Sequence, residues 1–323
     1  MVGRKGKREN REREKRREMT QEMIYIYSGE SKRLDLWLTE KLSDCTRSYV
    51  QKLIEKGNVL VNNSIVKAGI KLSEGDEVKV DIPLPEELQV VPQDIPLDIV
   101  YEDEDILIVN KTKDMVVHPA PGNPDGTLVN AVMFHCRDSL SDINGIIRPG
   151  IVHRIDKDTT GLLCVAKNNN AHLDLAEQLK EHSMKRTYVA LVEKVINEER
   201  GTVNAPIGRH PQDRKKMAVN LKNGREAVTH FKVLERFSKY TLIKLSLETG
   251  RTHQIRVHMA YIGHPVCGDD LYGRKFPLCE TNGQVLHAQQ LELKHPRTDK
   301  NQVFKCETPD YMNKILDLLR EKN

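Results

Sequence analysis

The segment from Gly150 to Lys167 constrains the fold of this chain most strongly, because it places a cluster of charges between two apolar, strand-like stretches. A Pro-Gly pair breaks regular structure before it, and an extended segment begins directly afterwards. The uninterrupted apolar run at 162–166 predicts a short buried strand. Asp156 falls at the connection between the two stretches, and the Thr-Thr-Gly sequence at 159–161 supplies turn chemistry there.

The charges around Asp156 allow two interpretations. Arg154, Lys157 and Asp158 flank it, and a neighbouring cation favours the ionised form of a carboxyl group. Asp156 therefore suits the role of a nucleophile or base rather than that of an acid. A structural ion pair at the end of a strand explains the same charges equally well, so this run alone leaves both interpretations open.

Composition narrows the class of protein. The chain has 323 residues, of which 38% are hydrophobic and 30% are charged, and no apolar stretch approaches the roughly 20 residues that a membrane-spanning helix needs. The charged N-terminus lacks the apolar core of a signal peptide. The six cysteines form no C-x-x-C pair and the 12 histidines show no ligand spacing. We therefore expect a soluble cytoplasmic protein without membrane contact, disulfide framework or metal site.

The charge of the chain is unevenly distributed. The formal net charge is +4, but residues 1–18 alone carry nine Lys or Arg and four Glu. This N-terminal excess predicts a basic, disordered tail over residues 1–24, which either solubilises the protein or contacts nucleic acid.

A small module is expected after the tail, over residues 25–82. Helical spacing of apolar residues predicts helices at 33–42 and 47–56. A tight β-hairpin at 59–66 and a closing strand at 76–82 complete it.

A stiff linker is expected at 83–96, where prolines and glutamates gather. Residues 97–323 then show many short extended segments, with a helix expected at 171–182. His253 and His258 are expected to lie in a strand or loop. A regular alternation of strands and helices is missing, so a doubly wound sheet is disfavoured.

The module at 25–82 resembles a known RNA-binding domain. Arg-Leu-Asp from residue 33, Thr-Arg-Ser from residue 46 and Leu-Ile-x-x-Gly-x-Val-x-Val-Asn from residue 53 are similar to the module first recognised in ribosomal small-subunit protein S-four. Asn63 stands where the module commonly has glycine, and asparagine tolerates the left-handed conformation of the turn. The resemblance implies that RNA phosphates meet six residues: Arg33, Arg47, Ser48, Gln51, Lys52 and Lys56.

The rest of the chain resembles the RNA pseudouridine synthases, and among them the type that acts on the ribosomal large subunit. The resemblance to the family rests on four ordered segments: 150–161, 185–192, 249–258 and 263–273. Segment 118–127 and the presence of the RNA-binding module carry the likeness to the large-subunit type. It implies an α+β protein in which the RNA-binding module precedes a catalytic domain built on a mixed, largely antiparallel β-sheet. It also implies an isomerase that needs no cofactor.

The resemblance further implies a role for individual residues. Asp156 is the catalytic carboxylate, and Tyr188 stacks on the flipped base. Arg154 fills the vacated space in the RNA or positions a phosphate. Arg251 pairs with Asp156, and Ile255 closes the pocket.

The expected activity is the conversion of uridine to pseudouridine in large-subunit ribosomal RNA by a monomeric enzyme. Transfer RNA is an alternative substrate. An RNA-binding ribosome-assembly factor on the same scaffold is an alternative of a different class. Whether the carboxylate of Asp156 attacks the ribose, attacks the base or removes a ribose proton is left open, because each route uses the same group.

Overall fold

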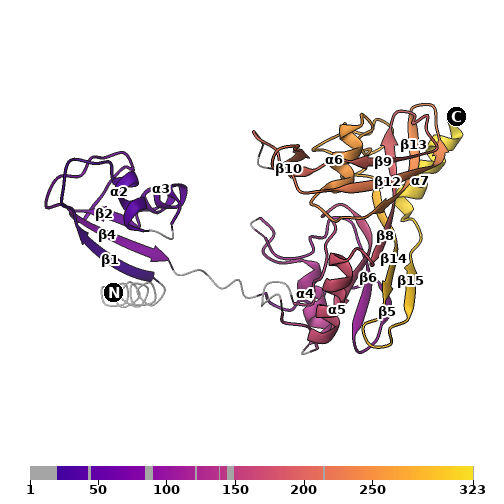
Figure 1. The fold of residues 1–323 in the computed structure, drawn as a ribbon, viewed down its shortest axis with the longest axis horizontal. Coiled ribbons are helices and arrows are strands. Elements are labelled where there is room, and N and C mark those ends of the chain that lie inside the picture. Colours follow the sequence, from indigo (N-terminus) through magenta and orange to yellow (C-terminus); the bar gives the residue numbers. More distant parts are fainter. Residues whose placement is uncertain are drawn as a thin grey trace, which may run out of the picture. The chain divides into compact units, whose positions relative to one another are not determined.

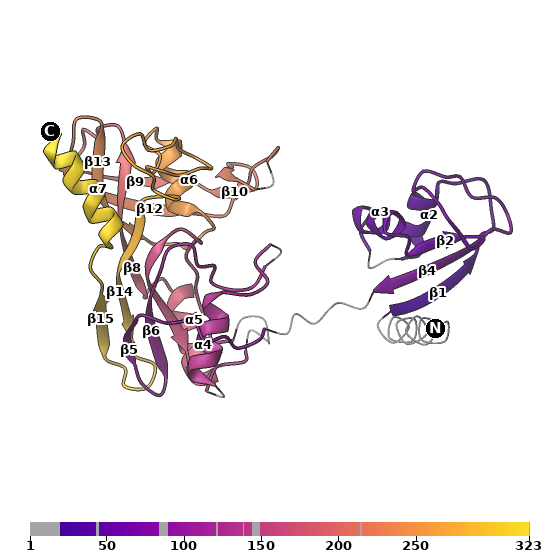
Figure 2. The same cartoon turned by 180° about the vertical axis from the view of Figure 1, so that it is seen from behind.

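The structure is a computed structural model that describes residues 20–42, 45–83, 90–120, 122–137, 139–143, 149–213 and 215–322. The chain divides into two compact units, Met1–Glu87 and Leu88–Asn323, which Figures 1 and 2 show from opposite sides. Most of the predicted basic tail lies outside the described residues. No helix in the described part of the chain is long and apolar enough to cross a membrane.

The first unit contains two helices and a four-stranded sheet within its described residues. Its elements are β1 (Thr20–Ile26), α2 (Leu34–Lys41), α3 (Arg47–Glu55), β2 (Val59–Val61), β3 (Ser64–Ile65) and β4 (Glu77–Pro83). The strand order is β1-β4-β2-β3 and each pairing is antiparallel. Trp37 packs edge-on against Tyr25 and Tyr27 inside this unit. Both predicted helices and the hairpin are therefore confirmed.

The hairpin turn shows why asparagine can replace glycine here. Asn62 and Asn63 have φ values of 49° and 61°, and a two-residue turn that follows the twist of its strands needs positive φ at both positions. Asparagine reaches this region at a lower cost than most other residues. The predicted effect of Asn63 on the hairpin is confirmed.

Strand β1 was not expected from the sequence. It begins at Thr20, within the range predicted as tail, and pairs along its length with β4. Met23 and Tyr25 pack on the core of the unit, whereas Ile24 and Ile26 are exposed. Because both faces of this strand carry apolar residues, the alternation that marks a surface strand is weak, and the adjacent charge run moved the expected boundary too far along the chain.

The end of the predicted linker belongs to the second unit. Val90 is buried in the main apolar cluster of that unit. The Asn130 side-chain amide donates to the carbonyl of Val91 over 2.8 Å, and the Gln93 side chain accepts from the Gly126 amide over 2.8 Å. Residues 84–89 of the predicted linker lie outside the described residues.

A nine-stranded mixed sheet forms the centre of the second unit, counted over its described residues. Its strand order is β5 (Ile99–Glu102), β6 (Ile106–Lys111), β7 (Thr160–Ala166), β14 (Leu286–Lys294), β8 (Lys185–Glu193), β13 (Tyr240–Leu247), β12 (Val228–Arg236) and β9 (Arg200–Asn204), with β15 (Asn301–Lys305) paired to β14. The β7–β14 pair is parallel and the other pairs of this sheet are antiparallel. The predicted α+β class with a largely antiparallel sheet is confirmed.

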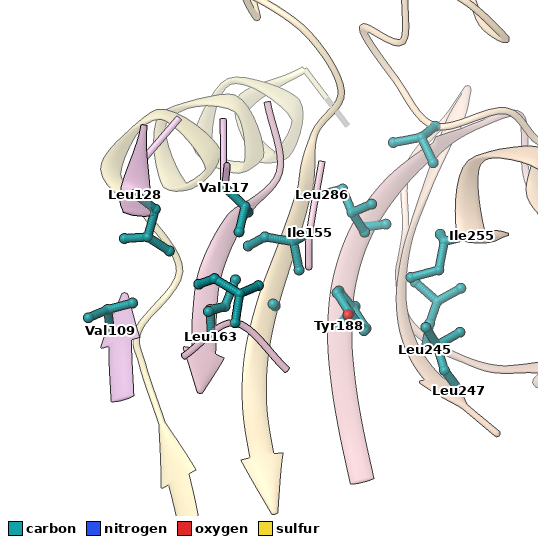
Figure 3. Close-up of a cluster of buried hydrophobic side chains, with 14 of the residues drawn as sticks. Val109, Val117, Leu128, Ile155, Leu163, Tyr188, Leu245, Leu247, Ile255 and Leu286 are labelled. Atoms are coloured by element: carbon teal, nitrogen blue, oxygen red, sulfur yellow. The ribbon is translucent and has the colours of Figure 1, made fainter. Parts of the chain in front are cut away.

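Helices and a small hairpin complete this unit. They are α4 (Leu128–Cys136), α5 (Asn169–Lys180), α6 (Gln254–Tyr261), α7 (Asp310–Glu321) and the β10 (Ile207–Arg209) to β11 (Met217–Val219) hairpin. Every residue of β7 is buried, because separate apolar clusters pack on its two faces. Figure 3 shows part of the larger cluster, with Leu163 of β7 and Tyr188 of β8 pointing into it.

The expected strand or loop is wrong for His258, which lies in helix α6, whereas His253 directly precedes this helix. Its first six residues, 254–259, are all buried, and three of them are polar. A helix buried on all sides has no apolar stripe with a period of 3.6 residues. The pattern on which sequence reasoning depends was therefore missing.

Candidate active site

The segment at 150–161 is held in place by two backbone contacts. Gly150 has φ of 70°, and a side chain there would lie 2.6 Å from the carbonyl oxygen of Ala166 in β7. Gly161 has φ of 110°, and a side chain there would collide with the backbone of Ala288 in the parallel strand β14. Both positions therefore require glycine. Asp156 lies in the connection between them, just before the turn that leads into β7.

Asp156 is held by an arginine that is itself fixed by a second carboxylate. Nη1 of Arg256 lies 2.9 Å from Oδ2 of Asp156. Nε and Nη2 of Arg256 donate to the two oxygens of Asp269 over 2.7 and 2.8 Å. Burial opposes the charge of the guanidinium, but Asp269 and Asp156 outweigh that effect and raise the pKa of Arg256. The geometry fixes the orientation of the Asp156 carboxylate.

The prediction that Arg251 pairs with Asp156 is wrong. Its Nε donates to the carbonyl of Glu226 over 2.9 Å, and Arg256 five residues later makes the ion pair. The two arginines flank the sequence Thr-His-Gln-Ile, and without knowing that α6 begins at Gln254 the sequence does not tell which of them faces Asp156. Arg251 nevertheless lies at the same pocket.

One pocket brings together all the residues predicted to surround the target base. Its lining includes Asp156, Arg154, Tyr188, Arg251 and Ile255. Tyr188 and Ile255 are buried in the apolar cluster beside it, where Figure 3 shows Tyr188 between Ile155 and Leu245. Burial raises the pKa of the Tyr188 hydroxyl. Arg154, by contrast, is exposed. The pocket thus combines an apolar wall, an aromatic ring, a carboxylate and cations.

A second charged site lies in the first unit, around the fully buried Asp35. Arg33 donates to both oxygens of Asp35 over 3.0 and 3.2 Å. Arg47 donates over 3.2 and 2.8 Å, and the Gln51 side chain over 3.1 Å. The bonds from Arg33 are the largest cause of a lowered Asp35 pKa, which burial opposes. Three of the predicted RNA contacts are therefore organised by one aspartate to which sequence reasoning had given no role.

The other three predicted RNA contacts lie on or beside helix α3. Ser48 and Lys52 are exposed in the helix, and Lys56 is the exposed C-cap residue. They are spaced four residues apart, so they lie along one side of the helix. The Ser48 hydroxyl lies 3.1 Å from that of Thr46, whose side chain caps the helix by accepting from the Tyr49 amide.

Comparisons with known proteins agree with this geometry. Residues 105–261 match the model of the RNA pseudouridylate synthase family, and residues 32–78 match the S4 domain. The RNA pseudouridine synthase YlyB of Bacillus subtilis (strain 168) is 51% identical over 291 residues, which cover 90% of this chain and 95% of that protein. The chain belongs to the RNA pseudouridine synthase family. It is thus an isomerase that acts on RNA, and its first unit is an S4 RNA-binding domain.

Two further comparisons extend this result. Ribosomal large subunit pseudouridine synthase D of Escherichia coli (strain K12) is 44% identical over 301 residues, covering 89% of this chain and 90% of that protein. The solved structure of human RNA pseudouridylate synthase domain containing 1 covers 73% of this chain and 97% of its own, with a TM-score of 0.52 and 26% identity.

Sequence reasoning missed His253, which lies beside Asp156 in this pseudouridine synthase, and Tyr272, which contacts His253. Nε2 of His253 lies 3.9 Å from Oδ1 of Asp156, and Nδ1 lies 2.8 Å from the hydroxyl of Tyr272. That hydroxyl also accepts from the Met217 amide over 2.8 Å. Burial lowers the pKa of His253, which favours the neutral ring. Both residues lie in quoted motifs, but only the fold shows that the two motifs meet at Asp156.

Proposed function

We propose that this enzyme converts uridine to pseudouridine in large-subunit ribosomal RNA, with the carboxylate of Asp156 as its catalytic group and without a cofactor. The observation that carries the proposal is the pairing of Asp156 with Arg256 in a pocket walled by Tyr188. The reaction breaks one glycosidic bond and forms another within the same nucleotide. It involves no net oxidation or reduction, so the amino acids of the pocket suffice.

The two oxygens of Asp156 are placed for different tasks. Oδ2 accepts from Arg256 over 2.9 Å, which fixes the carboxylate in one orientation. Oδ1 makes no hydrogen bond to any residue in the described part of the chain, and the side chain keeps 18% of its surface exposed. We expect Oδ1 to be the reacting oxygen. It serves equally well for attack on the ribose, attack on the base or removal of a ribose proton.

The surroundings of Asp156 suit an extruded nucleotide. A uridine within folded RNA must leave its stack to reach Asp156, which costs a few kcal/mol. The ring of Tyr188 offers a stacking surface, and Ile255 closes the apolar wall. Arg154 and Arg251 at the same pocket supply cations for the vacated space or for the phosphates beside the target.

The S4 domain supplies RNA binding that does not depend on sequence. Asp35 holds the half-exposed side chains of Arg33 and Arg47 in place, and Lys52 and Lys56 add charge along α3. Such cations bind phosphates, so RNA affinity falls with increasing salt. The choice of particular uridines then depends on RNA shape and on contacts of the catalytic pocket.

The ribosomal substrate is supported by the relatives named ribosomal large subunit pseudouridine synthase D. A cytoplasmic location agrees with this substrate, and we propose that the enzyme acts as a monomer. The decisive experiment incubates purified full-length protein with unmodified large-subunit ribosomal RNA and, separately, with transfer RNA. Formation of pseudouridine at defined positions of the large-subunit RNA supports the proposal. The same positions should remain unmodified in cells that lack the protein.

Two outcomes of this experiment contradict the proposal. If only transfer RNA is modified, the substrate is transfer RNA and not large-subunit ribosomal RNA. RNA binding without pseudouridine in either RNA, under conditions where the Escherichia coli relative is active, assigns a binding factor instead.

A further inference from the structure

The active pocket contains a buried arginine, Arg186, for which the described residues provide no partner. Arg186 lies near the start of β8 and lines the pocket. The residue is only 9% exposed, and its Nε atom is buried without a hydrogen-bond partner in the described structure. In contrast, Arg256 in the same pocket has two carboxylate partners. A buried cation without a partner is costly, so Arg186 calls for a functional explanation.

Two observations show that the fold makes room for this charge and leaves it unneutralised. A side chain at Gly250 would lie 2.6 Å from Nη1 of Arg186, so the bare backbone of this glycine accommodates the guanidinium. The buried ring of His153 has its pKa lowered to about 3 by burial and, in addition, by the positive charge of Arg186. No carboxylate among the described residues forms an ion pair with Arg186.

Arg186 is placed to meet the same ligand as Tyr188. The two residues are separated by one position on β8, so their side chains leave the same face of the strand about 7 Å apart. Both line the pocket that contains Asp156. A pyrimidine ring that stacks on Tyr188 therefore lies within reach of the guanidinium group.

We propose that Arg186 is a further catalytic residue, which donates a hydrogen bond to a carbonyl oxygen of the target uracil and stabilises negative charge on that ring. The proposal rests on the proposed roles of Asp156 and Tyr188. A preorganised donor aimed at developing charge is among the most effective catalytic devices in a site with little water.

Each route open to Asp156 places negative charge on the uracil. If Asp156 attacks C1′ of the ribose, an Asp156–C1′ bond forms while the C1′–N1 bond breaks and its electron pair leaves with the base. The Asp156–C1′ bond breaks when C5 of the turned base attacks C1′. If Asp156 removes the ribose proton at C2′, the C1′–N1 bond breaks with its electron pair on the base and a C1′=C2′ double bond remains. The proton returns to C2′ when C5 bonds to C1′. If Asp156 adds to C6 of the base, the π electron pair of the C5–C6 bond moves onto C5 and the adjacent carbonyl. The C1′–N1 bond then breaks, C5 bonds to C1′, and the Asp156–C6 bond breaks to release the carboxylate. In each route the proton on C5 is lost and N1 gains one. Arg186 therefore has the same task in all three routes.

A phosphate fits this position less well than the base does. Arg154 is exposed and Arg251 is partly exposed at the same pocket, and a hydrated phosphate suits such cations. Arg186 is buried next to the stacking ring, where the uracil is the part of the nucleotide that becomes anionic.

The first test measures single-turnover conversion of saturating RNA by Arg186→Gln. We expect the rate to fall about 10²- to 10³-fold, as for loss of one donor to a developing oxyanion, while RNA affinity changes little. Arg186→Lys restores part of the rate because it restores the charge. Lys185→Gln is the matched control, because this exposed neighbour on β8 bonds to the backbone of His182 outside the pocket, and its rate stays at the wild-type level.

The second test changes the RNA, so its result with wild-type enzyme does not depend on whether a variant folds. In RNAs that carry 2-thiouridine or 4-thiouridine at the target position, sulfur replaces one carbonyl oxygen of the uracil and is a weaker hydrogen-bond acceptor. Wild-type enzyme should convert one of these two RNAs more slowly than ordinary RNA. On that RNA, Arg186→Gln should add little further loss, since the contact is already weakened. If the rate losses from Arg186→Gln and from the thio substitution add fully on both RNAs, the proposal is contradicted. It is also contradicted if the rate loss of Arg186→Gln disappears on RNA in which the phosphate at the target is replaced by a neutral methylphosphonate.

Asp156→Asn separates failure of the two proposals. If Asp156→Asn still forms product on ordinary RNA, the proposed function of Asp156 is wrong. If it forms none while Arg186→Gln keeps the wild-type rate, only the role of Arg186 is wrong.

Discussion

Two aspartates, one in each unit of this enzyme, are both bound by arginines, yet the arrangements have opposite geometry. Asp35 of the S4 domain is fully buried, whereas its partners Arg33 and Arg47 keep 46% and 50% of their side-chain surface exposed. In the catalytic unit the cation is the buried member, because Arg256 is 7% exposed while Asp156 keeps 18% of its surface exposed.

The member left accessible is the one that we expect to meet RNA. At Asp35 the buried carboxylate orients cations, which suits contact with phosphates. At Asp156 the buried cation, fixed in turn by Asp269, orients a carboxylate, which suits chemistry. We therefore expect the same kind of ion pair to serve RNA binding in one unit and catalysis in the other, according to which member is buried.

Removing the cation beside Asp156 should have the largest effect among the partner residues. Arg256→Gln should lower the single-turnover rate about 10²- to 10³-fold, since it breaks a largely buried pair. Single-turnover conversion of saturating RNA, with binding of the same RNA measured in parallel, checks that the loss lies in the reaction and not in affinity.

Arg251→Gln is the matched control for Arg256→Gln, because Arg251 lies at the same pocket but contacts the backbone of Glu226. We expect Arg251→Gln to weaken RNA binding more than it slows conversion. A larger loss of rate at saturating RNA in Arg251→Gln than in Arg256→Gln would overturn the assignment of the ion pair.

The corresponding change in the S4 domain should affect binding instead of chemistry. Asp35→Asn releases Arg33 and Arg47 from fixed positions, so we expect RNA affinity to fall about tenfold with an unchanged rate at saturating RNA. Glu74→Gln removes one exposed charge from the same domain and serves as its control. A slower rate at saturating RNA in Asp35→Asn would contradict the division of tasks between the two units.

The lowered pKa of Asp35 predicts an acid-sensitive S4 domain. Because Asp35 titrates lower in the folded state than its ordinary value of 3.8, its contribution to stability is complete above about pH 4 and is lost as the pH falls toward the folded-state pKa. The single tryptophan, Trp37, lies in the core of this domain, so its fluorescence follows unfolding of this unit in the full chain. Asp35→Asn should lose part of the pH dependence, and an identical dependence would exclude Asp35 as its source.

The smallest effect is expected for an exposed lysine of α3. Lys52→Gln should weaken RNA binding slightly and equally for different sequences, and should lower the slope of log affinity against log salt by about 1. Titration of one RNA at several salt concentrations measures this slope. An unchanged slope would place Lys52 away from the RNA.

Local patterns in the sequence predicted much of this fold. The uninterrupted apolar run of β7 indicated a strand buried on both faces, and the Asn-Asn turn indicated the S4 hairpin. The resemblance to known families added Asp156, Tyr188 and Ile255, which the structure brings to one pocket.

The failures at helix α6 and at Asp35 share one physical cause, which is burial of polar groups. Helix α6 is buried on all sides, so its period was hidden, and Arg251 was chosen in place of Arg256. Asp35 carries a charge, and a charge in a sequence usually indicates an exposed position. Its burial depends on three donors, of which Arg33 precedes α2 and Arg47 and Gln51 belong to α3. Such partners are known only once the chain is folded.

The central claim is that Asp156 performs the chemistry and that RNA binding is a separate task. Single-turnover conversion of saturating large-subunit RNA by full-length Asp156→Asn tests it most directly, with binding of the same RNA measured in parallel. We expect wild-type affinity and a rate about 10⁴-fold lower or undetectable, as for loss of a catalytic side chain. Conversion at the wild-type rate would contradict it.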